Sequence, residues 1–270
     1  MASSTASTKS IGRPASPGAR SRSVIRYAIL SDVHGNLEAL TAVLADAARE
    51  GALGIACLGD LVGYGADPVA CVETLGERAV ATVAGNHEHG ALGLLDLDWF
   101  NPVARAATIW TRDALDADHR AYLATLPLRA VIEEATLVHA SPRNPHEWDY
   151  LVSEEEGLEV FGDFDTRLCF VGHSHWPAAW SLGSSGPDYE PGLAGEEARV
   201  RLEDGRRYLI NVGSVGQPRD RDPRAAYGLW DRDERTVTIR RVAYDLQGAA
   251  RKILRAGLPR ALADRLARGV

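Results

Sequence analysis

Cysteine is scarce in this chain, which has three cysteines among 270 residues. They are odd in number and show no paired spacing, so the sequence excludes a framework of disulfide bonds. Two of them, Cys57 and Cys169, lie in apolar runs, where a reduced thiol behaves as a small hydrophobic group. These features are typical of a reducing compartment, and we therefore expect the protein to be cytoplasmic.

Long apolar runs and an excess of positive charge are also missing. No apolar stretch approaches the roughly 20 residues that span a bilayer, so we expect no membrane partner. The formal net charge is −7 at pH 7, which gives no strong signal for binding to nucleic acid. The apolar and charged fractions are those of an ordinary globular protein.

The first 22 residues or so contain neither an acidic residue nor an apolar segment. A secretory signal needs an apolar segment, so this stretch cannot be one. It is rich in Ser, Thr, Arg and Pro, and we expect residues 1–22 to be a disordered tail. The same composition leaves a transit peptide open.

Short apolar runs alternate with helical patterns in the first part of the chain. The runs at 24–30, 55–58 and 79–84 predict buried strands. Asn36 and Asp67 are expected to cap the helices that follow the first two runs. This repetition predicts a parallel sheet with right-handed crossovers.

Residues 89–127 interrupt this order with two helical patterns, and we expect a helical insert there. We expect residues 23–270 to form one α/β domain. The later segments are predicted to be a hairpin at 128–138, an acidic amphipathic stretch at 153–161, a strand at 168–171, a surface loop at 183–197, hairpins at 198–212 and 225–244, and two short helices separated by Pro259.

Polar side chains follow five of the predicted strands. Because the carboxyl ends of strands in open α/β sheets meet at one crevice, we expect these side chains to converge. They are too many for one tetrahedral cation, whereas two cations that share a carboxylate would use them fully. The residues are Asp32 and His34, Asp60, Asn86 and His87, His139, and His173 and His175.

The order of these motifs resembles the calcineurin-like, or dinuclear metallophosphoesterase, superfamily, and is closest to its small bacterial phosphodiesterase-like branch. The resemblance covers most of residues 27–175 and implies a four-layer α/β/β/α sandwich of two mixed β-sheets flanked by helices. The matching motifs are Asp32-x-His34, Gly59-Asp60-x-x-Gly63, Gly85-Asn86-His87-Glu88, His139 and Gly172-His173-x-His175.

The resemblance also implies a cofactor, two divalent transition-metal ions bridged by Asp60. One ion would be held by Asp32, His34, Asp60 and His175. The other would be held by Asp60, Asn86, His139 and His173. The mixed imidazole and oxygen donors suit Mn, Fe, Co, Ni or Zn better than Ca.

The implied reaction is hydrolysis of a phosphodiester or small phosphoester by a metal-bridging hydroxide. His87 is not needed as a ligand and is the expected catalytic residue, donating a proton or holding a phosphoryl oxygen. Glu88 is expected to orient other groups. Arg143 and Tyr64 are candidates for substrate binding, Arg143 because its guanidinium matches phosphate oxygens.

The stretch from Leu61 to Gly65 departs from the pattern of the protein phosphatases and diadenosine tetraphosphatases, because their phosphate-holding arginine is missing. This favours a diester with one negative charge. A phosphomonoesterase or protein phosphatase-like activity is the alternative within the superfamily. A non-catalytic binding scaffold with the same fold is the alternative from another class, although such scaffolds are expected to have lost ligands.

Overall fold

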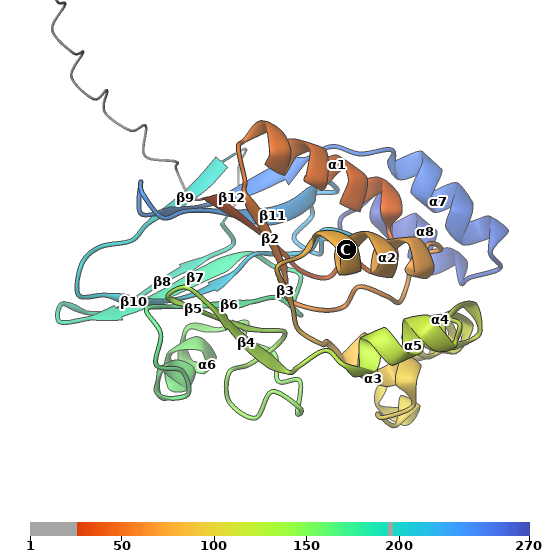
Figure 1. The fold of residues 1–270 in the computed structure, drawn as a ribbon, viewed down its shortest axis with the longest axis horizontal. Coiled ribbons are helices and arrows are strands. Elements are labelled where there is room, and N and C mark those ends of the chain that lie inside the picture. Colours follow the sequence, from red (N-terminus) through yellow and green to blue (C-terminus); the bar gives the residue numbers. More distant parts are fainter. Residues whose placement is uncertain (1–25, 194–196) are drawn as a thin grey trace, which may run out of the picture.

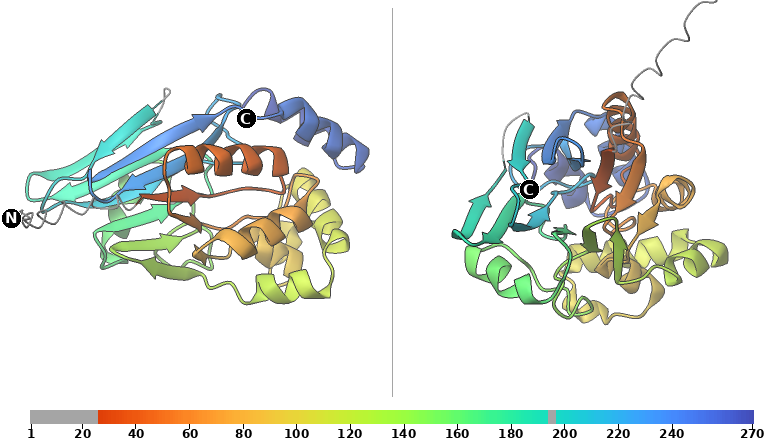
Figure 2. Two further views of the ribbon diagram at one scale, coloured as in Figure 1. Left: turned by 45° about the horizontal axis from the view of Figure 1, so that its top comes forward. Right: turned by 60° about the vertical axis from the view of Figure 1, so that its left-hand side comes forward.

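The computed structural model describes residues 26–193 and 197–270, so the predicted N-terminal tail lies outside the described residues. Two six-stranded sheets pack face to face, and helices cover their outer surfaces (Figures 1 and 2). The predicted α/β sandwich of two mixed sheets flanked by helices is confirmed.

The first sheet begins with three parallel strands and continues with antiparallel ones. β1 pairs with β2 in parallel and with β11 antiparallel, so it lies in the middle of the sheet. The strands, in spatial order, are β3 (Ala81–Thr82), β2 (Gly54–Cys57), β1 (Arg26–Leu30), β11 (Ala225–Asp231), β12 (Thr236–Val242) and β9 (Glu197–Arg201).

The second sheet has a parallel centre and antiparallel edges. β6 pairs in parallel with both β5 and β10. The strands, in spatial order, are β4 (Arg129–Ile132), β5 (Ala135–Val138), β6 (Leu168–Val171), β10 (Arg207–Asn211), β7 (Ala178–Gly183) and β8 (Gly186–Pro191).

Helices flank both sheets. α1 (Leu37–Arg49) packs on β11 and β12, next to α2 (Pro68–Arg78) and α7 (Leu246–Arg255), and α8 (Arg260–Leu266) packs on α7. α6 (Glu154–Glu159) and the short η2 (Val160–Gly162) cover the second sheet. α3 (Asn86–Leu92) begins before the expected insert 89–127 and ends within it, and the insert contains η1 (Leu97–Trp99), α4 (Pro102–Ala114) and α5 (Ala117–Ala124).

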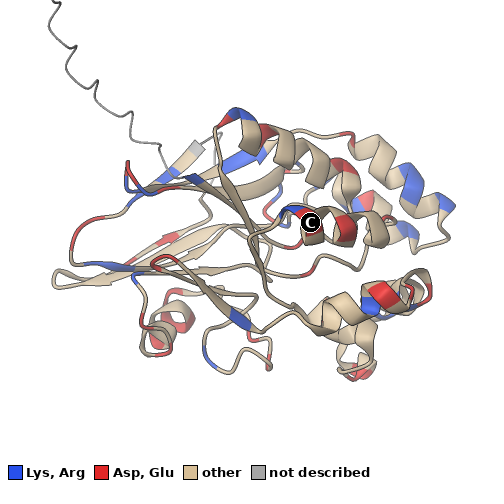
Figure 3. Ribbon diagram, in the orientation of Figure 1, with Lys and Arg blue, Asp and Glu red and all other residues tan. Residues whose placement is uncertain are grey.

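None of these helices is long and apolar enough to cross a membrane within the described part of the chain. Basic and acidic residues are interspersed over the helices and loops in the view of Figure 3.

The core explains why the strand runs are apolar without alternation. In β1, Ala28 and Leu30 face α1, whereas Ile29 faces the second sheet, where it joins Phe170 and Trp230. All five side chains are fully buried. A strand that is covered on both faces must be apolar at every position, as the sequence shows.

The two predicted helix caps have different outcomes. Asn36 caps α1 as predicted, because its side chain accepts a hydrogen bond of 3.1 Å from the amide of Ala39. Asp67 precedes α2 but makes no capping hydrogen bond, and its carboxylate instead accepts one of 2.8 Å from Lys252.

Two predictions for the second half are wrong. The segment 183–197, predicted to be a surface loop, contains β8, an edge strand that pairs with β7 and tolerates Pro187 and Pro191 because one side of an edge strand needs no partner. The segment 198–212 does not form a hairpin. Its strands β9 and β10 belong to different sheets, and the Asp204-Gly205 turn carries the chain between them.

Candidate metal centre

Five strand ends bring their polar residues together at one edge of the molecule. The residues follow β1, β2 and β3 of the first sheet and β5 and β6 of the second, so the centre joins the two sheets. His87 is buried here too. All seven ligand candidates lie in this cluster, and all except the half-buried Asn86 are buried: Asp32, His34, Asp60, Asn86, His139, His173 and His175.

Asp32, His34 and His175 form the first group of donor atoms, which lie within 4.8 Å of one another. His175 Nε2 is 3.1 Å from Asp32 Oδ1 and 3.0 Å from His34 Nε2. Asp32 Oδ1 is buried and makes no hydrogen bond with any residue that the structure describes. A buried carboxylate oxygen in this condition needs a cation.

Asp60, His139 and His173 form the second group, again within 4.8 Å. His139 Nε2 lies 3.1 Å from His173 Nδ1 and 3.2 Å from Asn86 Oδ1. The Oδ2 atom of Asp60 is 3.3 Å from His139 Nε2 and 3.7 Å from His34 Nε2. Asp60 therefore lies between the groups and can serve both.

The histidine tautomers fit metal binding. The Nδ1 atoms of His34 and His139 lie 3.1 and 2.9 Å from the carbonyl oxygens of Val62 and Leu58, and His175 Nδ1 contacts the carbonyl of Gln217. A carbonyl can only accept, so each Nδ1 carries the hydrogen. The Nε2 lone pair then faces the cluster, as a metal ligand requires.

The backbone of the centre is strained. Five of the seven ligand candidates have positive φ, where side chains are rarely tolerated. Conformations of this kind cost roughly 1–3 kcal/mol each and collect at functional sites. The φ values are 54° for Asp32, 50° for His34, 52° for Asp60, 63° for His173 and 60° for His175.

Glu88 holds the loop that presents Asp60. Its carboxylate accepts hydrogen bonds from the backbone amides of Asp60, Leu61, Val62 and Gly85, at 2.7 to 3.2 Å. Burial raises the pKa of Glu88 to about 7, and the four donors oppose that rise because they stabilise the ionised form. Glu88 thus has the orienting position that its place in the motif predicts.

Burial keeps most of the imidazole rings neutral. It lowers the pKa of His87 to about 4, that of His173 to about 3, and that of His34 well below its usual range. Neutral imidazole is the form that binds metals.

His139 and Asp60 form an exception, because each shifts the pKa of the other. Burial would lower the pKa of His139, but the carboxylate of Asp60 raises it to about 9. Burial would raise the pKa of Asp60, but its histidine neighbours, His139 first, hold it well below its usual range. Each of the two groups thus favours the charged form of the other.

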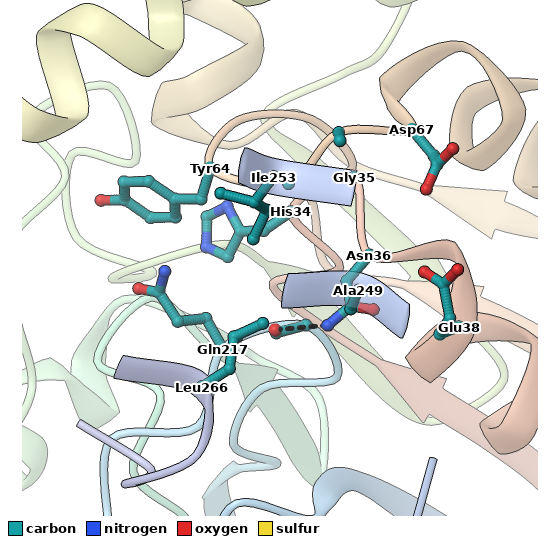
Figure 4. A pocket seen from close by; sticks show the side chains of 13 residues that line it. His34, Gly35, Asn36, Glu38, Tyr64, Asp67, Gln217, Ala249, Ile253 and Leu266 are labelled. Atoms are coloured by element: carbon teal, nitrogen blue, oxygen red, sulfur yellow. Dashed lines mark hydrogen bonds between the residues drawn. The ribbon is translucent and has the colours of Figure 1, made fainter. Parts of the chain in front are cut away.

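His87 is held among aromatic rings at the rim of the centre. Its ring centroid lies 4.5 Å from that of Tyr64, 4.9 Å from that of His34 and 5.3 Å from that of Phe100. Its Nδ1 atom is buried and has no hydrogen-bond partner among the described residues. Tyr64 also packs on His34, with centroids 4.5 Å apart, and Figure 4 shows the two rings side by side above Gln217.

Arg143, the other candidate for substrate binding, is engaged by acidic side chains. Its guanidinium forms ion pairs with Asp163 at 3.0 Å and Glu159 at 3.3 Å. A substrate phosphate would have to displace these carboxylates.

The loop from Gly213 to Arg219 is more important than its sequence indicated. Ser214 Oγ and the amide of Gly216 donate hydrogen bonds to the carbonyl of Asp32, at 2.9 and 2.8 Å. The Arg219 guanidinium, which is not among the site residues predicted from the sequence, lies 3.5 Å from the Tyr64 hydroxyl. The glycines of this loop, which follow a strand, are the only feature of the sequence that marks it. They do not reveal that Arg219 contacts a residue 155 positions away.

Comparison with known proteins supports these observations. The family model described as calcineurin-like phosphoesterase matches residues 25–177. An uncharacterized protein of Methanocaldococcus jannaschii is 41% identical over 246 residues, which are 88% of this chain and 96% of that protein.

Two solved structures are similar over most of the chain. A metallophosphoesterase from Sphaerobacter thermophilus is 43% identical, with a TM-score of 0.78, and the match covers 92% of this chain and all of that one. A hypothetical protein from Pyrococcus horikoshii is 20% identical, with a TM-score of 0.73, and the match covers 91% of this chain and 99% of that one. The second similarity shows the fold alone.

Gly172 offers a test of how tightly the centre is packed. A Cβ atom there would lie 1.8 Å from Ser31 Oγ and 2.5 Å from Asp32 Oδ2. We expect Gly172→Ala to weaken manganese binding by about tenfold or more, because displaced supporting groups typically cost that much. Metal analysis after reloading and gel filtration measures the loss.

Gly162→Ala is the matched control, because a Cβ atom there would meet nothing within 4 Å. It should bind manganese as the unaltered protein does, and circular dichroism should show both variants folded. Full metal content in a folded Gly172→Ala variant would contradict the described packing.

Proposed function

The chain belongs to the calcineurin-like phosphoesterase family, and we propose that it is a cytoplasmic, metal-dependent hydrolase of small phosphodiesters. Members of this family are phosphoric ester hydrolases that use two divalent metal ions, and the Asp and His groups here are positioned to hold such a pair. The observation that carries the proposal is the shared position of Asp60 between two groups of donors. Three free, buried cysteines support the reducing location.

We assign the ligands by these two groups. One ion would take Asp32, His34, Asp60 and His175, and the other Asp60, Asn86, His139 and His173. Manganese, iron, cobalt, nickel and zinc all suit this combination of imidazole and oxygen donors.

Bound divalent ions would lower the pKa of water toward neutrality and offset the charge of a phosphate ester. The protein groups have separate tasks. His87, whose aromatic neighbours fix the plane of its ring, would donate a hydrogen bond to a substrate oxygen or, where the negative charge of the substrate phosphate raises its pKa, a proton. Glu88 would keep Asp60 in place through the amides of its loop.

The preference for a diester rests on charge. Tyr64 occupies the stretch from which an arginine would hold a phosphate in the protein phosphatases. Arg143 is engaged by carboxylates. A diester has one negative charge where a monoester has nearly two, so it needs less positive charge around it. We propose Tyr64, next to His87, as a substrate contact.

We expect protein that is stripped of metal and reloaded with manganese to hydrolyse bis(p-nitrophenyl) phosphate faster than p-nitrophenyl phosphate. The reason is that Tyr64 stands where an arginine would hold the phosphate and that carboxylates engage Arg143, which leaves Arg219, 3.5 Å from the Tyr64 hydroxyl, to meet the charge. Rates of p-nitrophenolate release, with and without added chelator, make the comparison.

Each outcome has a distinct meaning. A faster monoester rate would favour the phosphomonoesterase alternative. Inactivity toward both esters, without bound transition metal, would refute the enzyme and favour a binding scaffold.

His87→Ala should lower kcat by roughly 10²–10⁴-fold, the usual contribution of a proton-transferring group. It should keep both metal ions, because His87 is not among the assigned ligands. Steady-state kinetics and metal analysis on the same preparation test both points. His119→Ala, far along the insert and paired with Asp116, is the control. Loss of metal from His87→Ala would show that His87 is a ligand.

A further inference from the structure

A cleft of about 610 Å³ opens beside the metal centre. Three residues of the centre form part of its lining, namely Asn86, His87 and His173. One wall comes from the insert, residues 95–104, and the other from the loop 146–150. The volume lies within the range of small-molecule sites. A substrate phosphate at the centre would therefore extend its ester groups into this cleft.

Aromatic side chains line both walls. Trp99 and Phe100 belong to the insert, and Trp148 and Tyr150 to the opposite loop. The ring of Tyr150 stacks on His173, with centroids 4.1 Å apart and planes at 30°. The stacking on His173, a candidate metal ligand, thus holds the Tyr150 ring next to the metal centre.

Much of this aromatic surface is uncovered. The Trp99 side chain is 86% exposed and that of Tyr150 is 50% exposed. In the same cleft, the Trp148 Nε1 atom is buried and has no acceptor within the described chain. Exposed rings of this kind offer a planar ligand a surface on which to stack.

The charges in the cleft restrict the ligand further. None of the described lining residues is Lys or Arg, and two are the carboxylates Glu147 and Asp149. Phosphates are bound by cationic side chains. The described lining of the cleft therefore offers a polyphosphate chain no lysine or arginine to pair with. A ligand with a single phosphate and an uncharged ring has no such requirement.

We propose that the cleft binds a planar aromatic ester group of the substrate, stacked on Trp99 and Tyr150. The substrate class is then a monoanionic phosphodiester with an aryl or nucleoside substituent. The proposal rests on the proposed function, since it concerns the same centre.

The test varies one ester group and keeps the leaving group constant. Manganese-loaded protein is given methyl, phenyl and thymidine 5′ esters of p-nitrophenyl phosphate. Stacking of a base on an aromatic side chain contributes about 1–3 kcal/mol. Replacing Trp99 or Tyr150 by Ala should therefore lower the ratio of kcat/KM for an aromatic ester to kcat/KM for the methyl ester by roughly 5- to 150-fold. The change should arise mainly from a higher KM for the aromatic esters. Comparison between variants cancels differences in intrinsic reactivity.

Trp176→Ala is the matched control, because this indole is 51% exposed and does not line the cleft. It should leave the ratio of aromatic to methyl ester unchanged. Trp99 is mostly exposed, so its removal should not affect folding, and the melting temperature verifies this.

Calorimetry with phenyl phosphate and methyl phosphate adds a readout that does not need turnover. If phenyl phosphate binds more tightly than methyl phosphate and Trp99→Ala removes the difference, the aromatic site is supported. This holds even if no ester is hydrolysed, and the proposed function would then fail while the aromatic site stands. Equal binding of the two phosphates, or an ester ratio that neither Trp99→Ala nor Tyr150→Ala changes, overturns the aromatic site. If the methyl ester is still hydrolysed in that case, the proposed function stands without the aromatic site.

Discussion

Three carboxylates buried at one edge of two sheets are the constraint on which the rest of the structure depends. Asp32, Asp60 and Glu88 are at most 1% exposed. Among the described residues, the ion pairs of Asp32 and Asp60 are with histidines. Burying charge without compensation is costly. Two divalent cations would offset the charges of Asp32 and Asp60 and leave a positive remainder that suits a phosphate ester, whereas four backbone amides stabilise Glu88.

Apolar packing elsewhere in the fold offsets the backbone strain at this edge. The two sheets bury an apolar layer between them, and a further layer lies between the first sheet and α1. This packing supports five ligand candidates in left-handed backbone conformations. Asp32 and His34 both have positive φ just after β1, and His34 Nε2 lies 3.7 Å from Asp32 Oδ1. The strained backbone and the ligand positions are thus the same feature.

The sequence predicted most of the centre because its information is local. Each ligand candidate stands directly after an apolar run, and the ends of such runs meet at one edge whatever the exact twist of the sheets. The α/β class, the hairpins 128–138 and 225–244 and the cap at Asn36 followed from the same local rules.

What could not be predicted depends on contacts between distant segments. The Asp204-Gly205 turn is typical of a hairpin, but packing of the sandwich sends its two strands into different sheets. The approach of Arg219 to Tyr64, and of Trp99 and Tyr150 to one cleft, arises from segments that only the tertiary fold brings together.

The central claim is that this buried cluster is a two-metal centre bridged by Asp60. Anomalous diffraction from crystals of the manganese-loaded protein tests it most directly. The account predicts two peaks about 3.5–4 Å apart, the spacing of two-metal hydrolytic sites, with the Asp60 carboxylate between them. A single peak, or two peaks without Asp60 as a shared ligand, would contradict it.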